Sequence, residues 1–447
     1  MKTPIFDFVQ KYVESNTVRA HMPAHKGIGA LGCERGDITE VEGADVLYHA
    51  DGIIRESERN AARLFGTAKT LYSCEGSSLS IRAMLYLALV YAKSEGRAPR
   101  ILAARNAHKA LLCACALLDI DIEWMYGEQD RDMMSCKITP EMLCDHLDAS
   151  GSFPCAVYMT SPDYLGNIAD IEGLSRVCRE RGVLLLVDNA HGAYLHFLSE
   201  SRHPISLGAD ICCDSAHKTL PVLTGGGYLH ISRRAPHVCA EAAESAMALF
   251  ASTSPSYLIL QSLDRANRYI SDGYSERLLA FTLRVDRTRE RLVRAGYTLV
   301  GDEPIKLTLK ARSYGYTGDE LALYLRSGGV EVEFSDPDYA VLMLSPENTE
   351  EDISRIERVL CSLAPRQQID AVAPSVCRAE RVMTPREAML SLSREVCVRD
   401  AVGLVLAQPS VSCPPAIPVL VCGERIDESA VRAFEYYGIE RCRVVDK

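Results

Sequence analysis

The sequence predicts an α/β protein with a mainly parallel sheet between helices, followed by a smaller C-terminal α+β domain. Short apolar runs alternate with helical stretches through the middle of the chain, which is the pattern of β-α-β units. The run Val183–Asp188 is apolar up to its final aspartate, as expected of a strand covered on both faces. From about residue 296, strands with partial alternation precede one long helix. We therefore expect an N-terminal helix and loop segment at 1–55, a large domain at 56–295 and a small domain at 296–447.

The expected elements follow from these patterns in chain order. The strands of the large domain are Ile101–Ala104, Cys155–Thr160, Val183–Asp188, Asp210–Cys213 and Gly227–Ile231. The helices that separate several of them are Ser78–Lys93, His108–Leu118 and Ile171–Arg181. The small domain is expected to hold strands within 297–301, 304–310, 330–334 and 339–345, helices at Glu350–Ala364 and 384–396, and a short strand late in 413–424.

Composition excludes several classes of protein. Forty-nine basic and 60 acidic residues among 447 give a net charge of −11, which argues against a nucleic-acid-binding protein. The N-terminus lacks the apolar core of a signal peptide, and no apolar run is long enough to span a membrane. The 17 cysteines include no C-x-x-C pair, so we expect free thiols in a reducing, cytoplasmic compartment and no metal site.

Polar residues gather at the ends of two neighbouring strands. Asp188 and His191 follow the first, in DNAHG, while Ser215, His217 and Lys218 follow the second, in DSAHKTLPVLTGGG. In open α/β sheets, ligands bind at the carboxyl ends of strands. We therefore expect these five side chains to face one region.

The set fits the needs of pyridoxal phosphate (PLP). Lys218 supplies the amine for a Schiff base with the cofactor aldehyde, and Asp188 a carboxylate for the pyridine nitrogen. Ser215 and the turn Gly76–Ser78 before a helix supply phosphate ligands, and His108 supplies a flat ring to cover the cofactor.

Each of these features also has a structural explanation. A lone lysine is usually a solvated charge, a lone aspartate at a strand end is often a helix cap, and Gly76–Ser78 serves equally as an N-cap. The combination of Asp-x-Ala-His-Gly with Ser-x-His-Lys, on successive strand ends, favours the cofactor site.

Several motifs in one order resemble the fold-type-I PLP-dependent enzymes of the aspartate aminotransferase-like superfamily. Within it they resemble the ornithine/lysine/arginine decarboxylase family, in its short form without a wing domain. The resemblance implies a seven-stranded, mainly parallel sheet and covers nearly the whole chain. The motifs are HMPAHKG (21–27), DITEVEGADVLYHADGII (37–54), RNAHKA (105–110), TSPDYLG (160–166), DNAHGA (188–193), SAHKTLPVLTGG (215–226), STSPSYLILQSLD (252–264) and CPPAIPVLVCGE (413–424).

The resemblance also implies a role for each matching residue. Lys218 would carry PLP, Asp188 would pair with the pyridine nitrogen, Ala190 would pack beneath the ring and His108 would stack above it. His191 would lie beside the reacting carbon. The phosphate would be held by Gly76, Ser77, Ser78, Ser215 and His217. Thr253 would reach the phosphate of a neighbouring subunit, which implies a homodimer or a multiple of dimers with active sites at the subunit interface. Glu424 would contact the distal cation of the substrate.

Departures from the family pattern put the substrate in doubt more than the cofactor. Ala24 and Ala416 stand where glycines are usual, Cys422 replaces a proline and Asn189 a glutamate. Cys74–Glu75 replace the residues usual before the glycine turn. None of these changes removes a group that PLP needs.

His21 and His25 are spaced as helical metal ligands are, but Pro23 lies between them and opposes a helix. We expect a loop near the substrate instead, with a purely structural role as the alternative.

The expected function is decarboxylation of arginine, lysine or ornithine, giving CO2 and an amine of the kind used in polyamine biosynthesis. Lys218 or His191 would return the proton to Cα. Two alternatives stay open: a PLP-dependent aminotransferase or lyase, since fold does not fix the reaction, and a PLP-binding inactive paralogue. An aminotransferase would need an arginine for the α-carboxylate, and the sequence does not single one out.

Overall fold

The structure is a computed structural model. It describes residues 1–127, 134–149, 151–370, 373–375, 378–409, 411–413 and 417–446.

Seven strands form the main sheet, in the order β1-β7-β6-β5-β4-β2-β3. They are β1 (Lys69–Ser73), β2 (Arg100–Ala104), β3 (Asp121–Met125), β4 (Ala156–Thr160), β5 (Leu184–Asp188), β6 (Ile211–Asp214) and β7 (Gly227–Ile231). Strands β4, β5 and β6 are mutually parallel, and β2 is parallel to β3. Strand β7 pairs antiparallel with both β1 and β6. The predicted α/β class with a mainly parallel sheet is therefore confirmed.

The chain divides into two compact units. The first unit comprises residues 1–99, 144–161 and 170–278, and the second comprises residues 100–143, 162–169 and 279–447. The sequence-based division at residues 55 and 295 stays a prediction.

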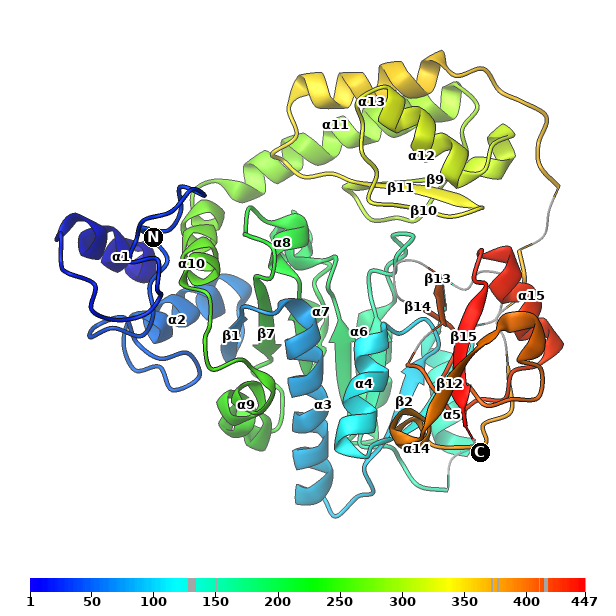
Figure 1. The fold of residues 1–447 in the computed structure, drawn as a ribbon, viewed down its shortest axis with the longest axis horizontal. Helices are drawn as coiled ribbons and strands as arrows, with labels where there is room; N and C mark the ends of the chain where they lie inside the picture. The colour runs from blue at the N-terminus through cyan, green and yellow to red at the C-terminus, as the bar shows by residue number, and fades with distance from the viewer. Residues whose placement is uncertain are drawn as a thin grey trace. The chain divides into compact units, whose positions relative to one another are not determined.

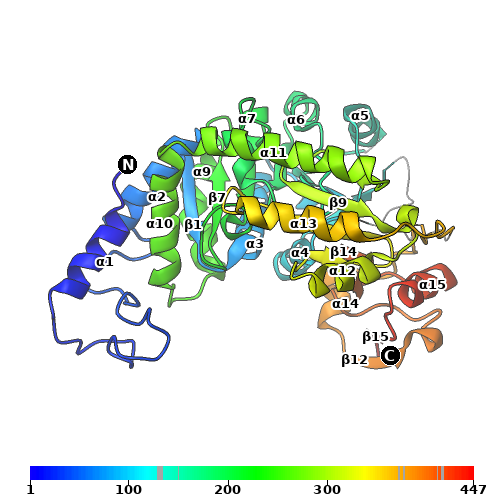
Figure 2. The ribbon, with the colours of Figure 1, turned by 90° about the horizontal axis from the view of Figure 1, so that it is seen from above.

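Helices of the first unit pack around its strands. They are α1 (Pro4–Glu14), α2 (Ile53–Phe65), α3 (Gly76–Ser94), α6 (Ile171–Glu180), α7 (Pro204–Leu207), α8 (Ala216–Thr219), α9 (His237–Phe250) and α10 (Tyr257–Ser271), with the 3-10 turn η1 (Ala193–Phe197). Helix α5 (Pro140–Ala149) begins in the second unit and ends in the first. Helices α3 and α9 pack against each other, and both contact β1 (Figure 1). Helices α1, α2 and α10 form a second group, which is clearest from above (Figure 2).

The second unit contains a separate four-stranded sheet, in the order β10-β11-β9-β8. Its strands are β8 (Leu299–Val300), β9 (Lys306–Lys310), β10 (Phe334–Ser335) and β11 (Tyr339–Met343). Helices α11 (Tyr274–Arg294), α12 (Gly318–Ser327) and α13 (Glu350–Ser362) lie on one face of this sheet (Figure 1). The α+β character predicted for this region is what the structure shows.

The remaining elements of the second unit are α4 (Lys109–Leu118), the turns η2 (Ala311–Tyr314) and η3 (Val398–Asp400), α14 (Pro385–Leu390), α15 (Glu428–Tyr436), and the strand pairs β12 (Ser393–Cys397) with β15 (Arg441–Val445) and β13 (Val411–Cys413) with β14 (Ile417–Leu420). The helix expected over 384–396 is wrong in its second half, because residues 393–397 pair as a strand with β15. The strand expected over 330–334 was placed too early, and the structure begins it at Phe334.

Among the described residues, no helix is both long enough and apolar enough to cross a membrane.

Candidate active site

Lys218 lies in the short helix α8, which follows β6 in the first unit. Its Nζ atom is 3.0 Å from Nε2 of His191, which belongs to the loop after β5. Lys218 is half-buried, whereas His191 is only 5% exposed. Two successive strand ends therefore bring the predicted anchor and the predicted acid into hydrogen-bond contact.

Asp188, the last residue of β5, is held in one orientation. The side chain is 2% exposed, and its Oδ2 accepts a hydrogen bond of 3.1 Å from the hydroxyl of Tyr158. Its Oδ1 accepts a bond of 3.2 Å from the amide of Ala190. A buried carboxylate with fixed donors suits the pairing that a pyridine nitrogen needs. Tyr158 was missed in the sequence, although it lies on the neighbouring parallel strand, two residues before its end.

The predicted phosphate ligands also converge. The hydroxyl of Ser215 donates to that of Ser77 at 2.9 Å, so the end of β6 meets the first turn of α3. Helix α3 begins at Gly76, whose φ of +65° favours glycine, and Ser78 lies in the same first turn. The N-terminus of a 19-residue helix beside two hydroxyls is suited to an anion.

Close backbone packing holds this turn in place. The amide of Gly76 donates to the carbonyl of Gly225 at 2.7 Å. A Cβ atom on Gly227 would lie 2.9 Å from the carbonyl oxygen of Asp214 and 3.1 Å from the carbonyl carbon of Gly76. His217 makes its own contact with this loop, since its Nδ1 is 2.9 Å from the carbonyl of Gly226. The glycines 225–227 are therefore needed because larger residues would keep the Gly76 turn and the end of β6 apart.

The departures at Cys74 and Glu75 have a structural explanation. Glu75 Oε1 accepts a 2.8 Å hydrogen bond from the amide of Ser252, and Cys74 Sγ donates to the carbonyl of Ser256 at 3.7 Å. Burial raises the pKa of the Cys74 thiol to about 12, so it stays protonated. Together they fasten the loop that carries the exposed Thr253 to the glycine turn.

His108 and Glu424 belong to the second unit. His108 caps helix α4, its Nδ1 accepting a 3.2 Å bond from the amide of Ala110. Glu424 is 4% exposed and accepts a 2.8 Å bond from the amide of Val421. Its Oε2 also lies 3.9 Å from Nη2 of Arg105. Glu424 thus already has a cation beside it, and the expected roles of His108 and Glu424 stay predictions.

His21 and His25 make local contacts. Nε2 of His21 is 2.6 Å from the hydroxyl of Tyr12, and Nε2 of His25 is 3.2 Å from Oδ2 of Asp37. These partners fix both rings within the N-terminal segment, and the substrate role expected of them stays a prediction.

The remaining departures lie in different surroundings. Ala24 is exposed, whereas Cys422 is 2% exposed and its Sγ faces the carbonyl of Pro385 at 4.0 Å. Ala416 lies outside the described residues.

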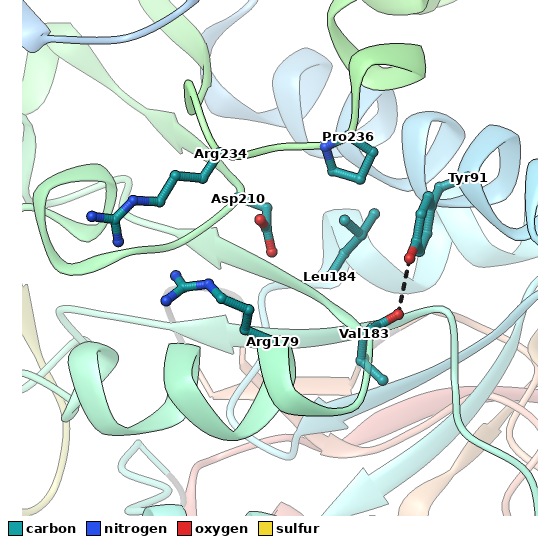
Figure 3. Close-up of a pocket in the computed structure, with 8 residues that line it drawn as sticks. Tyr91, Arg179, Val183, Leu184, Asp210, Arg234 and Pro236 are labelled. Atoms are coloured by element: carbon teal, nitrogen blue, oxygen red, sulfur yellow. Dashed lines mark hydrogen bonds between the residues drawn. The ribbon is translucent and has the colours of Figure 1, made fainter.

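A cavity of about 380 Å³ lies at the opposite end of the same strands. Leu184 begins β5 and Asp210 precedes β6, and both line this cavity together with Arg179 and Arg234 (Figure 3). Asp188 lies at the other end of β5, and Ser215 lies beyond the other end of β6, so this cavity is separate from the predicted cofactor site.

Comparisons with known proteins decide the family. The sequence model described as "Orn/Lys/Arg decarboxylase, major domain" matches residues 3–299. The chain belongs to the Orn/Lys/Arg decarboxylase family.

Curated relatives of this decarboxylase cover almost its whole length. An arginine decarboxylase of Bacillus subtilis is 29% identical, over 96% of this chain and 92% of the relative. One of Halalkalibacterium halodurans is 28% identical over the same shares. Solved lysine decarboxylases share the fold. That of Francisella novicida has a TM-score of 0.81 at 17% identity, over 99% of this chain and 81% of that one. That of E. coli has a TM-score of 0.78 at 18% identity, over 100% and 82%.

The chain is therefore a PLP-dependent decarboxylase of a basic amino acid. The residues present fit this cofactor, because the first unit brings together an amine, a buried carboxylate and two hydroxyls at a helix N-terminus. These groups match the aldehyde, the pyridine nitrogen and the phosphate of PLP.

Proposed function

We propose that this enzyme decarboxylates arginine, with Lys218 as the covalent anchor of PLP. The observation that carries the proposal is the 3.0 Å contact between Lys218 Nζ and Nε2 of His191. His191 follows the same strand, β5, that ends at Asp188. The choice of arginine rests on the curated relatives named arginine decarboxylase, which align over 96% of the chain. Its product, agmatine, is an amine of the polyamine type.

PLP, when bound, supplies the electron sink that accepts the bonding electrons as CO2 leaves. The chain's own residues do the rest. The Asp188 carboxylate keeps a proton on the pyridine nitrogen, and the hydroxyl of Tyr158 and the amide of Ala190 hold that carboxylate still. Ser77, Ser78, Ser215 and His217 hold the phosphate, with the Gly76 turn.

His191 and Lys218 handle the proton that replaces the carboxylate. His191 is almost fully buried, so water has little access to its Nε2. Because Nε2 lies within hydrogen-bond distance of Lys218 Nζ, a proton can pass between them, and either atom can then deliver it to Cα.

Glu424 is the proposed contact for the distal cation of the substrate, with His21 and His25 as further candidates. Arg105, 3.9 Å from Glu424, competes for the same carboxylate. Glu424 would then serve the substrate only with one oxygen, since Oε2 already accepts the Val421 amide.

We further propose that the active unit is a homodimer in the cytoplasm. Thr253 is exposed on a loop tied to the glycine turn, which is suited to a contact with a second subunit. The described cysteines are free thiols, in keeping with a reducing compartment. Cell fractionation with an antibody would test the location.

The test of the substrate is a panel of arginine, lysine and ornithine with the PLP-loaded enzyme, in which CO2 and the amine are both measured. We expect agmatine at the highest kcat/KM. Cadaverine as the main product would show that lysine is the substrate, and putrescine would show that ornithine is. No amine from any of the three would overturn the proposal.

Glu424→Gln, with the exposed Glu428→Gln as its control, locates the distal contact. We expect Glu424→Gln to raise KM for arginine, because it removes the charge that pairs with the guanidinium. An unchanged KM would remove Glu424 from the substrate site.

A further inference from the structure

Asp214 is the last residue of β6 and is fully buried. Its carboxylate accepts hydrogen bonds from three side chains. Asn189 Nδ2 donates to Oδ1 at 2.7 Å, and His203 Nε2 and His230 Nε2 each donate to Oδ2 at 3.1 Å. All four residues belong to the first unit.

Two histidines and a carboxylate are also a common set of metal ligands, but the hydrogen bonds decide otherwise. His203 Nδ1 accepts the amide of Ile205 at 3.3 Å, so the proton of the neutral ring is on Nε2. His230 Nδ1 lies 2.9 Å from the hydroxyl of Thr70, which can donate to it in the same way. Both Nε2 atoms then carry hydrogen and point at Asp214 instead of offering lone pairs to a metal.

Asp214 therefore holds a negative charge inside the protein. Burial alone would raise the pKa of this carboxyl, but the two histidines hold it well below its ordinary value. Burial lowers the pKa of His230. Nδ1 of His203 is occupied by the amide of Ile205, so this ring reaches Asp214 only through its Nε2 donor.

A buried charge is unfavourable unless its partners compensate for the lost hydration, and an apolar residue would fill the end of a strand at lower cost. The position of Asp214 suggests what the charge does. Ser215, a predicted phosphate ligand, is the next residue, and Asp188 ends the adjacent strand, where it pairs with Cys213.

Asn189 connects the charge to the predicted cofactor site. It lies between Asp188 and Ala190, and its main-chain amide donates to the carbonyl of Cys213 at 3.0 Å. Its side chain is fixed by Asp214 on one side. On the other, a Cβ on Gly192 would come within 2.1 Å of Asn189 Oδ1, so only glycine leaves it room. Asn189 is also one of the departures from the family motif.

We propose that Asp214 is a positioning residue for PLP: through Asn189 it fixes the strand end that presents Asp188 and Ala190, and its charge reinforces that of Asp188. His203 and His230 hold the Asp214 carboxylate by hydrogen bonds, and that carboxylate in turn holds the side-chain amide of Asn189. This inference rests on the proposed roles of Asp188 and Lys218.

The variant that removes only the charge is Asp214→Asn. Its amide oxygen can still accept from His203 and His230, and its NH2 can donate to Asn189 Oδ1 once the Asn189 amide turns over. We expect the PLP dissociation constant of the apoprotein, measured by absorbance titration, to rise about tenfold, the size of about one pKa unit of lost charge stabilisation. The visible absorbance band of bound PLP should shift as well.

A second variant keeps the charge and removes the link. Asn189→Ala leaves the two histidine bonds to Asp214 intact, and we expect it also to weaken PLP binding. The exchange variant N189D/D214N restores one carboxylate and one amide in contact. It should return the PLP dissociation constant to within about threefold of the native value, since the coupled pair is re-formed.

The matched control is Asp210→Asn, at the other end of β6, where the carboxylate accepts from the amide of Leu185 at 2.8 Å. It should leave PLP binding unchanged. A purely structural role for Asp214 predicts lower thermal stability of the apoprotein with a native PLP dissociation constant and spectrum, and that result would overturn the inference. If Asp214→Asn does not fold, the same comparison is made between Asn189→Ala and the exchange variant.

Asp188→Asn separates this inference from the function on which it rests. If Asp188→Asn itself leaves PLP affinity and the absorbance band native, the proposed cofactor site is wrong. If Asp188→Asn changes both while Asp214→Asn and Asn189→Ala change neither, only the role of Asp214 fails.

Discussion

At the scale of single residues, the site depends on contacts between side chains whose chemistry the sequence already displays. The convergence of Lys218, His191, Asp188 and Ser215 was predictable because each lies at, or within four residues of, the carboxyl end of β5 or β6, and parallel strands end at one edge of a sheet. Tyr158 and Asp214 were given no role, and Asn189 was noted only as a departure from the family pattern, because PLP itself requires none of these three groups. His203 and His230 reach Asp214 from elements that only the fold brings together.

His191→Gln should bind PLP with a native absorbance spectrum but lower kcat about a hundredfold, within the usual range for loss of a general acid. His196→Gln, a nearby histidine outside the proposed site, is the control. Stopped-flow spectra and steady-state rates measure the two effects. A native kcat would leave the proton transfer to Lys218 alone.

Glu58 predicts a pH dependence of stability. Burial raises the pKa of its carboxyl to about 8, above the ordinary value of 4.5, so the folded state binds more protons than the unfolded state between these values. The free energy of unfolding therefore falls as pH rises from about 4.5 to about 8.

In the native protein the Tyr72 amide donates to Oε1 of Glu58 at 2.9 Å. Glu58→Gln keeps an oxygen that can accept this hydrogen bond but has no carboxyl group to titrate. Its stability relative to the native protein should grow by more than about 1 kcal/mol between pH 5 and pH 8. Thermal melts at both pH values test this, with the exposed Glu56→Gln as control. A constant difference between the two proteins would contradict it.

At the scale of elements, the apolar strands were predicted well and the polar ones were not. Gly227–Ile231 has the predicted bounds, and the strand ending at Asp188 begins one residue later than predicted. Lys69–Ser73 and Asp121–Met125 were missed, because charged residues interrupt their apolar pattern. The sequence over 393–397 continues the helical pattern of the preceding residues, but in the structure these residues form a strand, because their pairing with β15 outweighs local propensity.

The loop before α2 is organised by one carboxylate. Helix α2 has no side-chain cap at Gly52, but Asp45 Oδ2 accepts the amides of Gly52 and Ile54 at 2.9 Å each. Its Oδ1 accepts the amide of Asp51 at 3.1 Å. Asp45→Ala should lower the free energy of unfolding by about 1–3 kcal/mol. Urea denaturation beside the exposed Asp51→Ala tests this, and equal stabilities of the two variants would refute it.

At the scale of the whole molecule, the proposed dimer makes a prediction about mixed subunits. If Thr253 reaches the phosphate of the neighbouring subunit, a Lys218→Ala subunit paired with a Thr253→Ala subunit regains one native site. Refolding the two inactive or weakened variants together in equal amounts should then give about a quarter of native activity, because half of the dimers are mixed and each has one good site of two. Activity no higher than the average of the separate variants would place Thr253 at its own subunit's site.

The attachment of the cofactor is the claim on which the rest depends, and borohydride reduction followed by peptide mass mapping tests it most directly. Reduction fixes PLP to whichever lysine holds it. The account predicts one phosphopyridoxyl group, on the peptide that contains Lys218, and none on the Lys218→Ala protein. Modification of another lysine, or no modification of the native PLP-loaded protein, would contradict it.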